Sequence, residues 1–273
     1  MSPTAAPRLL VTDLGTMPYA DALALQRTVA RARITGRIAD DVLLLVEHPP
    51  VVTLGRRTQA TSLPLSTDAL RARGVEVFEV ERGGDVTFHG PGQLVGYPVV
   101  DLKRHRRDLH WYLRQVEEAL IRGVAEFGVA GGRHAGYTGV WIGDGDPAHS
   151  AWVPRRKLAS IGVHARDWVT WHGFALNVTR APLDYFDLIV PCGIAGVEMT
   201  AVAREAPALR AADVSVATVG AAVAGALARA FSLAATPFAR AALDEALDDV
   251  PDDAPDEPLA AGTTPALASH QVD

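Results

Sequence analysis

The chain has 273 residues, of which 48% are hydrophobic and 21% charged, proportions that are ordinary for a globular protein. Its single cysteine excludes an intrachain disulfide, and the opening residues lack the basic and apolar regions of a signal peptide. No apolar run reaches the roughly 18 to 20 residues that a bilayer span needs. We therefore expect a cytoplasmic protein with no membrane partner.

The net charge of −6 is unevenly distributed along the chain. Residues 244–273 hold nine acidic residues and no Lys or Arg, which leaves 23 acidic and 26 basic residues in 1–243. A nearly neutral body argues against nucleic acid as a partner. The acidic end is rich in Pro and Ala and poor in large apolar residues, so we predict a folded domain over 1–240 and a disordered tail over 245–273.

The secondary structure expected from the sequence alternates strands with a few helices. Pro18 predicts the start of a helix that runs to Ile34, because proline fits a first helical turn. Apolar or alternating runs predict strands at 42–47, 51–54, 75–80, 94–102, 137–142, 157–165 and 174–178. Two more helices are predicted at 109–127, closed by Gly128, and at 214–231, with Asp213 as N-cap. Since most gaps between strands are too short for crossover helices, we predict an α+β fold with a mostly antiparallel or mixed sheet and packed helices.

The stretch RGGDVTFHGPGQ (Arg82–Gln93) is unusually rich in glycine around a histidine. Glycine lets a backbone approach a ligand closely, so this loop can line a pocket with main-chain N–H groups. A tight hairpin with a surface histidine is the structural alternative. No Gly-Lys-Ser/Thr follows, so the loop is not a Walker motif.

A lysine and a glycine-containing strand follow later in the chain. Lys157 opens an alternating strand beside Arg155 and Arg156, and a lysine close to other cations can serve as a base. Taken alone, the stretch favours a solvated basic edge that blunts strand pairing. The stretch WHGFALN (Trp171–Asn177) fits either a pocket wall or ordinary core packing.

The stretch VPCGIAGV (Val190–Val197) holds the lone Cys192. A free cysteine is more often a buried apolar residue than a nucleophile. The following Gly193 allows a sharp turn that presents its N–H to an oxyanion, but a reactive thiolate also needs a nearby cation or base. Lys157 and His89 are the candidates, and only the fold can bring either of them close.

Taken together, these stretches resemble one family. EHPPVVTLGRR (47–57), the 82–102 segment, RKLASIGVH (156–164), HGFALNV (172–178) and VPCGIAGVEMTAV (190–202) occur in the order found in octanoyltransferases of lipoate biosynthesis. The resemblance covers about residues 8–235 and makes 1–240 the catalytic domain. It implies a fold related to the catalytic domains of biotin and lipoate protein ligases.

The resemblance also implies the reaction. An octanoyl group passes from acyl carrier protein, through a thioester on the enzyme, to a lysine of a lipoyl domain. The acceptors include lipoyl domains of 2-oxoacid dehydrogenase complexes and the glycine cleavage H protein. Exchange between thioesters needs neither ATP nor a metal, so no cofactor is expected.

The family's functional residues fall on positions of this sequence. Cys192 matches the nucleophile and Lys157 the lysine that pairs with it, although His89 stays open as the proton partner of the thiol. His89 and main-chain N–H groups near Cys192 are candidates for stabilising the oxyanion. The matched substrate-binding residues are Arg82, Gly83, Gly84, Asp85, Val86, Thr87, Phe88, His89, Ser160, Ile161, Gly162, Gly173, Phe174 and Ala175.

Two further expectations concern the apolar chain and the carrier. The glycine-rich loop and Phe174–Ala175 are expected to wall an apolar tunnel for the eight-carbon chain. The basic stretches Lys103–Arg107 and Arg155–Arg156 fit an acidic carrier protein, or are solvated faces.

The sequence departs from the family at a few places and leaves other functions open. Phe88 stands where the family often has tyrosine, and Gly143–Arg155 is longer than a tight hairpin needs. The alternatives are an ATP-dependent lipoate or biotin ligase, which needs no cysteine, a cysteine thioesterase, and an acyl-binding protein in which Cys192 is structural.

Overall fold

A mixed sheet forms the centre of the computed structural model, which describes residues 6–149, 152–193, 196–206, 213–248 and 250. The strands of this sheet are β1 (Arg8–Thr16), β2 (Asp41–Glu47), β6 (Gln93–Val99), β7 (Gly132–His134), β8 (Tyr137–Gly143), β9 (Pro154–Arg166), β10 (Val169–Asn177), β11 (Glu198–Met199) and β12 (Ala234–Pro237). Their order is β12-β1-β2-β6-β10-β9-β8-β7, and β11 pairs with β9.

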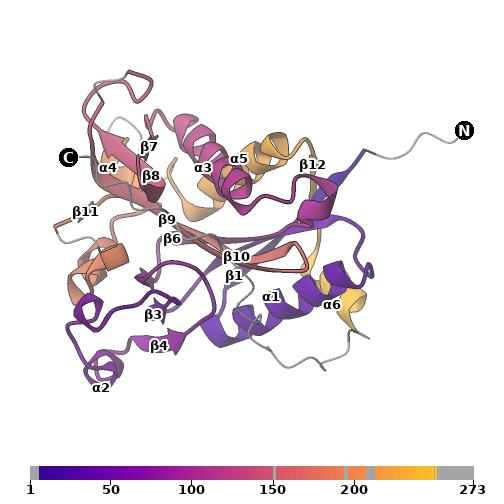
Figure 1. The fold of residues 1–273 in the computed structure, drawn as a ribbon, viewed down its shortest axis with the longest axis horizontal. Coiled ribbons are helices and arrows are strands. Elements are labelled where there is room, and N and C mark those ends of the chain that lie inside the picture. Colours follow the sequence, from indigo (N-terminus) through magenta and orange to yellow (C-terminus); the bar gives the residue numbers. More distant parts are fainter. Residues whose placement is uncertain (1–5, 150–151, 194–195, 207–212, 249, 251–273) are drawn as a thin grey trace, which may run out of the picture.

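Helices cover both faces of this main sheet, and a small second sheet packs beside it (Figure 1). The small sheet, in the order β4-β3-β5, consists of β3 (Val51–Leu54), β4 (Glu76–Glu79) and β5 (Val86–His89). The helices are α1 (Tyr19–Ile34), α2 (Thr67–Arg71), α3 (Leu109–Ala125), α4 (Val202–Glu205), α5 (Val216–Ala230) and α6 (Arg240–Leu247). Short 3₁₀ turns are η1 (Ala60–Ser62), η2 (Leu102–Arg104), η3 (Leu183–Leu188) and η4 (Pro191–Gly193).

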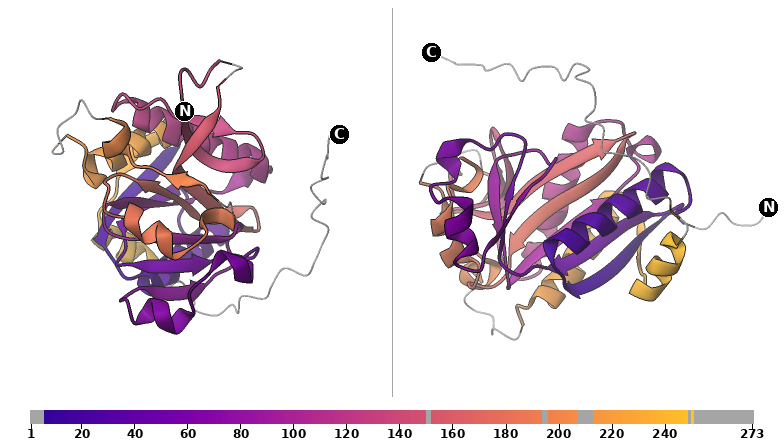
Figure 2. Two further views of the ribbon diagram at one scale, coloured as in Figure 1. Left: turned by 90° about the vertical axis from the view of Figure 1, so that its left-hand side faces the viewer. Right: turned by 90° about the horizontal axis from the view of Figure 1, so that it is seen from below.

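Strand β2 shows why its run Val42–Val46 is apolar without interruption. Leu43 and Leu45 belong to the core that includes residues of α3 and α5, whereas Val42, Leu44 and Val46 belong to the core that includes residues of α1 and α6. Figures 1 and 2 show these two helix pairs on opposite faces of the sheet. Because both faces are buried, successive side chains on β2 must all be apolar.

The predicted α+β fold is confirmed, with differences in detail. Strands β1, β5, β7, β11 and β12 were not expected, and the pairs β1–β2, β1–β12, β3–β4 and β9–β11 are parallel. The main sheet is therefore mixed, and most of its strand pairs are antiparallel, as predicted. In the described residues, no helix is both long and apolar enough to cross a membrane.

The ends of two helices differ from the prediction. Ser215, rather than Asp213, caps α5: its Oγ accepts the Thr218 N–H at 3.1 Å, and Thr218 Oγ1 accepts the Ser215 N–H at 3.0 Å. This reciprocal capping box satisfies two helix-end groups at once. The expected domain end at 240 is too early, because α6 follows and buries Leu243 and Leu247. Residues 251–273 of the predicted tail lie outside the described residues.

The buried carboxylate of Glu117 joins α3 to the β7–β8 hairpin. Its Oε2 accepts from Arg114 Nη1 at 2.5 Å and from Arg133 Nε at 3.1 Å, and its Oε1 accepts the Gly139 N–H at 3.0 Å. The residue is fully buried, whereas the neighbouring Glu118 is about one-third exposed and also binds Arg133.

We expect Glu117→Gln to lower the free energy of unfolding by about 1.5–3 kcal/mol, because buried charge-assisted hydrogen bonds are lost. The matched change Glu118→Gln should cost no more than about 1 kcal/mol, as for an exposed ion pair. Denaturant unfolding of both variants measures the difference. Equal losses would show that Glu117 does not fix the hairpin.

Candidate active site

The turn that carries Cys192 is fastened to the edge of the small sheet. The Val190 N–H donates to the Ser62 carbonyl at 2.9 Å, and Ser62 Oγ donates to Asp85 Oδ2 at 2.6 Å. Gly193 has a φ of +67°, and a side chain at this position would collide with the Asp85 carboxylate. The backbone of Cys192 thus lies in η4 beside Asp85, while its side chain lies outside the described part of the chain.

Lys157 is buried on β9 and is tied to the segment that follows η4. Only 2% of the residue is exposed, and Nζ lies 5.0 Å from the centre of the Trp141 ring. Gly139 makes room for it, because a Cβ there would lie 2.9 Å from Lys157 Cε. Strand β11 pairs Met199 with Lys157, and the Thr200 N–H donates to the Lys157 carbonyl at 2.9 Å.

The Arg82–Gly84 part of the loop packs on β9. The Gly83 N–H donates to the Val163 carbonyl at 2.9 Å, and a side chain at Gly162 would lie 2.6 Å from the Gly83 carbonyl oxygen. Arg82 is buried and donates to Thr53, with Nη2 2.6 Å from the carbonyl oxygen and 2.9 Å from Oγ1. The Arg82 guanidinium thereby binds β3 near its end, at Thr53.

The predicted VTFH segment is a strand, β5, whose two faces have different surroundings. Val86 and Phe88 are buried in the core of the small sheet, where the Phe88 ring stacks on Tyr185 at 4.6 Å between centroids. Side chains alternate along a strand, so Thr87 and His89 lie on the other face. The predicted substrate-binding set is therefore divided, and Val86 and Phe88 belong to the core.

The predicted residues on β9 and β10 are divided in the same way. Ile161 and Phe174 pack in the core that includes α3 and α5, where the Phe174 ring occupies the space left by Gly96. Ala175 belongs to the core of the opposite face. The side chains of Phe174 and Ala175 thus pack on opposite faces of the sheet, and the tunnel expected beside them stays a prediction.

Ser160 and Gly173 take different places from these core residues. Alternation on β9 puts Ser160 on the face opposite Ile161, the face on which Arg82 and Gly83 approach Gly162. A side chain at Gly173 would collide with the Gly96 carbonyl, so Gly173 allows β10 and β6 to approach. Of the β9 and β10 residues predicted, Ser160 and Gly162 are those that face the Arg82 loop.

His89 has a partner at each ring nitrogen. Nδ1 lies 2.9 Å from Gln93 Oε1, and Nε2 lies 3.3 Å from Thr53 Oγ1. Burial, together with the nearby His48 and Arg82, holds the pKa of His89 well below its usual range. His89 is therefore neutral and engaged on both sides.

Three residues of this region were not predicted as functional. Ser62 donates a hydrogen bond to Asp85 beside the η4 turn, and Thr53 accepts hydrogen bonds from Arg82. Asn177 donates to the Thr200 carbonyl at 3.0 Å. Asn177 gave one usable signal, since a polar residue that ends the apolar run FAL must find a buried partner. Ser62 and Thr53 carry no comparable sequence signal.

The two basic stretches considered for carrier docking differ in position. Arg155 and Arg156 pair with Asp144 and Glu205, respectively. Asp101 forms a β-bridge with Val169 at the start of β10. The stretch Lys103–Arg107 follows Asp101 closely in the chain and therefore lies near this end of β10. Nine residues of β10 separate this end from the site, a distance of about 26 Å.

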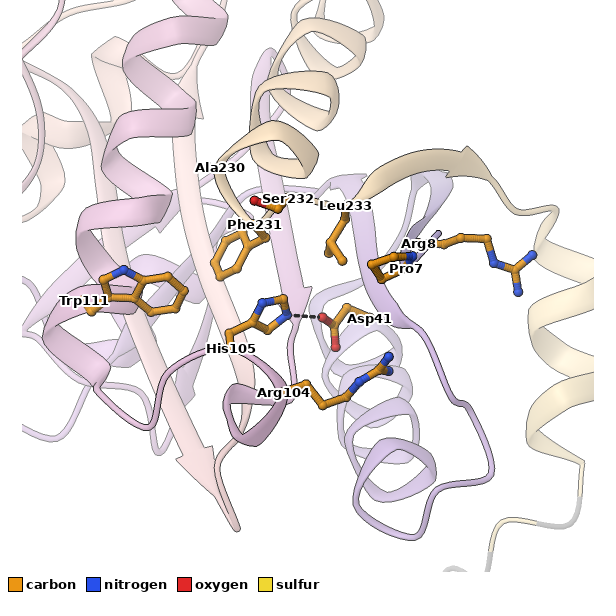
Figure 3. Close-up of a pocket in the computed structure, with 10 residues that line it drawn as sticks. All are labelled: Pro7, Arg8, Asp41, Arg104, His105, Trp111, Ala230, Phe231, Ser232 and Leu233. Atoms are coloured by element: carbon orange, nitrogen blue, oxygen red, sulfur yellow. Dashed lines mark hydrogen bonds and ion pairs between the residues drawn. The ribbon is translucent and has the colours of Figure 1, made fainter. Parts of the chain in front are cut away.

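A cavity of about 420 Å³ lies at that distant end (Figure 3). There His105 Nε2 lies 2.7 Å from the buried Asp41 Oδ2, beside the rings of Trp111 and Phe231. None of the residues that line it belongs to the predicted site. Within the described ranges, no three His, Cys, Asp or Glu side chains are grouped as metal ligands.

Comparison with known proteins identifies the class. Residues 18–228 match the family model "Lipoyl protein ligase A/B catalytic domain", so the chain belongs to this family. A putative lipoate protein ligase from T. acidophilum with bound lipoic acid has the same fold, with a TM-score of 0.63, 18% identity and coverage of 89% of this chain and 92% of that one. Lipoate-protein ligase A bound with ATP gives 0.62 at 17% identity, covering 89% and 95%.

Within this family, the chain is similar to octanoyltransferases. It is 51% identical over 204 residues to that of Acidobacterium capsulatum, covering 72% of this chain and 80% of the relative. Identity to the octanoyltransferase of Gloeobacter violaceus is 48% over 187 residues, covering 68% and 77%. The resemblance seen in the motifs is thereby confirmed: the protein is an acyltransferase of the octanoyltransferase group.

We expect Gly193→Ala to reduce transferase activity by about 10-fold or more, because the methyl group would push η4 away from Asp85. Gly196→Ala is the matched control: its φ is +74°, but no atom lies within 4 Å of the added carbon. Both variants carry similar backbone strain, so initial rates separate strain from displacement. Equal rates for the two would contradict the assigned role of the Gly193–Asp85 contact.

His48 should make the protein less stable in mild acid. Its Nε2 lies 2.7 Å from the Tyr97 hydroxyl, and burial lowers its pKa to about 4. Between that value and the unfolded value of about 6.5, the unfolded chain binds a proton that the folded chain does not. The contribution of neutral His48 to the free energy of unfolding is thus fully present above about pH 6.5, and about 3 kcal/mol of it is lost as the pH falls to about 4. Denaturant unfolding at several pH values should give a flatter profile for His48→Gln; parallel profiles would contradict this assignment.

Proposed function

We propose that the protein transfers an octanoyl group from acyl carrier protein to a lysine of a lipoyl domain, with a thioester on Cys192 as the intermediate. The observation that carries the proposal is the pairing of β11 with β9, which joins the segment just after Cys192 to the backbone of Lys157. The similarity to octanoyltransferases supports the acyl group and the class of reaction.

The first half-reaction exchanges thioesters. Cys192 Sγ attacks the octanoyl carbonyl carbon, a new C–S bond forms, and the C–S bond to the carrier breaks. The thiol proton of Cys192 passes through Lys157 Nζ to the departing carrier thiolate. One thioester replaces another, so this step needs no ATP.

The second half-reaction forms an amide. The acceptor lysine nitrogen attacks the Cys192 thioester, the C–N bond forms and the C–S bond breaks. Lys157 Nζ takes a proton from the attacking nitrogen and returns it to the Cys192 thiolate. The amide is more stable than the thioester, so the step runs downhill.

Lys157, rather than His89, is the proton carrier in this proposal. His89 has partners at both ring nitrogens and a strongly lowered pKa, so it is poorly suited to accept a thiol proton. A lysine ammonium beside a thiolate also favours the charged form of the sulfur.

The partners proposed are acyl carrier protein as donor and, as acceptors, lipoyl domains of 2-oxoacid dehydrogenase complexes and the glycine cleavage H protein, all in the cytoplasm. The catalytic domain that meets them extends through α6. Of the basic stretches first considered, Lys103–Arg107 lies at the end of β10 away from the site.

The experiment is an intact-mass measurement after mixing the protein with octanoyl acyl carrier protein, without ATP. The wild type should gain one octanoyl group, which hydroxylamine removes and which disappears on addition of a lipoyl domain. Cys192→Ala, which removes the nucleophilic atom, should gain no octanoyl adduct. An adduct that persists in Cys192→Ala would refute the assigned nucleophile.

Lys157→Met serves as the second variant, since it keeps the buried stem and removes the amine. We expect turnover to fall by about 100-fold or more with an unchanged thermal transition, as for a lost general base. A requirement for ATP would identify a ligase instead, and release of free octanoate in the presence of the acceptor would identify a thioesterase.

A further inference from the structure

A continuous chain of hydrogen bonds crosses the site from the Arg82 loop to β11. All of its members are less than 10% exposed, and they come from both sheets. In order, they are Arg82, Thr53, His89, Gln93, Asn177 and Thr200. We refer to them as the Arg82–Thr200 chain.

The distances are those of ordinary hydrogen bonds at nearly every step. Arg82 Nη2 and Nε lie 2.9 and 3.2 Å from Thr53 Oγ1, and Thr53 Oγ1 lies 3.3 Å from His89 Nε2. His89 Nδ1 lies 2.9 Å from Gln93 Oε1, and Gln93 Nε2 lies 2.9 Å from Asn177 Oδ1. Asn177 Nδ2 reaches the Thr200 carbonyl oxygen at 3.0 Å.

The end at β11 fixes the direction of the bonds. The Thr200 carbonyl can only accept, so Asn177 turns its amide NH₂ toward it and its Oδ1 toward Gln93. Gln93 must then donate to Asn177, and its NH₂ also reaches the Phe88 carbonyl at 3.1 Å. The remaining atom, Gln93 Oε1, faces His89 Nδ1, which must therefore carry the hydrogen.

The other end independently gives the same direction. A guanidinium only donates, and Arg82 Nε and Nη2 occupy both lone pairs of Thr53 Oγ1. The hydroxyl hydrogen of Thr53 is therefore directed to His89 Nε2. Every bond thus donates toward Thr200. Hydrogen bonds aligned in this way polarise and strengthen one another, and the charge of Arg82 lies at the donor end.

We propose that Gln93 and Asn177 are positioning residues: they hold His89 as the neutral Nδ1–H tautomer and tie β11, and with it the Lys157 strand, to the Arg82 loop. Thr200 connects the Arg82–Thr200 chain to β9, because its carbonyl accepts the last hydrogen bond of the chain and its N–H donates to the Lys157 carbonyl. The effect on catalysis rests on the proposed function, whereas the tautomer does not.

Burial and the neighbouring charges favour the neutral ring of His89 and outweigh the hydrogen bond to Gln93, which favours the charged ring. His48 lies with its ring centre at 5.9 Å, the Tyr19 ring stacks at 5.9 Å, and Arg82 and His172 add repulsion of positive charge. With its lone pair at Nε2 directed to the Thr53 hydroxyl, His89 cannot donate to an oxyanion. The expected oxyanion role of His89 is therefore replaced by one of positioning.

The tautomer is tested by NMR of full-length protein labelled with ¹⁵N-histidine, with the His89 signals assigned by their loss in His89→Gln. The expected spectrum has a protonated Nδ1 and an unprotonated Nε2 that do not change between pH 5 and 8. A hydrogen on Nε2, or titration of the ring in this range, would overturn the proposal.

Gln93→Glu provides the sharpest variant, since a carboxylate still accepts from His89 but no longer donates to Asn177. It should raise the pKa of His89 enough for imidazolium signals to appear near neutral pH. Asn177→Asp breaks the chain at Thr200 and should lower kcat by about 10- to 100-fold, with KM for the octanoyl donor within about 2-fold.

Thr170→Val is the matched control on the same strand. Thr170 is fully buried and its hydroxyl binds the Pro98 carbonyl and the Val100 N–H, but it lies outside the Arg82–Thr200 chain. It should lower thermal stability to a similar degree while leaving kcat and the His89 signals unchanged. Equal loss of kcat in both β10 variants would show that Asn177 acts only through stability.

The intact-mass and NMR experiments together distinguish a failure of this proposal from a failure of the proposed function. If the wild type forms no Cys192-linked octanoyl adduct, the transfer mechanism fails, and the NMR spectra still decide the direction of the chain. If the adduct forms normally while His89 shows the other tautomer, the positioning role fails alone.

Discussion

The two-residue pairing of β11 with β9 is the contact on which the rest of the site depends. The chain leaves η4, which is held by Ser62 and Asp85 at the edge of the small sheet, and then joins the main sheet at Lys157. Without this pairing, the Cys192 segment would be held by the small sheet alone and Lys157 by the main sheet alone. A contact so short cannot supply much free energy by itself, so neighbouring groups must stabilise it.

Thr200 shows how that stabilisation is arranged. Its N–H binds the Lys157 carbonyl, its carbonyl accepts from Asn177, and its hydroxyl donates to Glu205 Oε1 at 2.5 Å. Glu205 also binds Arg156 through both oxygens, at 2.8 and 3.0 Å. The charge of Arg156, which the sequence suggested for an acidic partner, therefore braces β11, and a half-buried ion pair is better suited to hold a strand than to meet a carrier.

The sequence predicted well those parts whose pattern repeats. The apolar run of β2 and the helical pattern of α3 extend over enough residues to show a period, and the helix after Pro18 has a clear start. A strand of two residues has no period, so β11 could not be found. The glycine-rich loop hid β5, because its glycines suggested turns on both sides of a strand that is fully buried.

The site was predicted unevenly for a related reason. Cys192 and Lys157 were identified by resemblance, and the structure joins their segments. Motif membership does not show which way a side chain points: the side chains of Phe174 and Val86 pack in cores, and their part in substrate binding stays a prediction. Thr53 was missed because its importance comes from Arg82 and His89, which only tertiary structure brings to it.

The fold itself does not choose between thioester and adenylate chemistry. A lipoate-protein ligase solved with ATP shares the architecture over 89% of this chain at only 17% identity. The features of this chain that bear on the choice are local: a cysteine in a turn held by Ser62 and Asp85, and a glycine at 193 that lets that turn approach the carboxylate. An activated carboxylate must be made from ATP when the donor is a free acid, but a thioester donor arrives already activated. In the proposed function, Lys157 is the buried proton carrier on this scaffold, and Cys192 keeps the acyl group on the enzyme between its two partners.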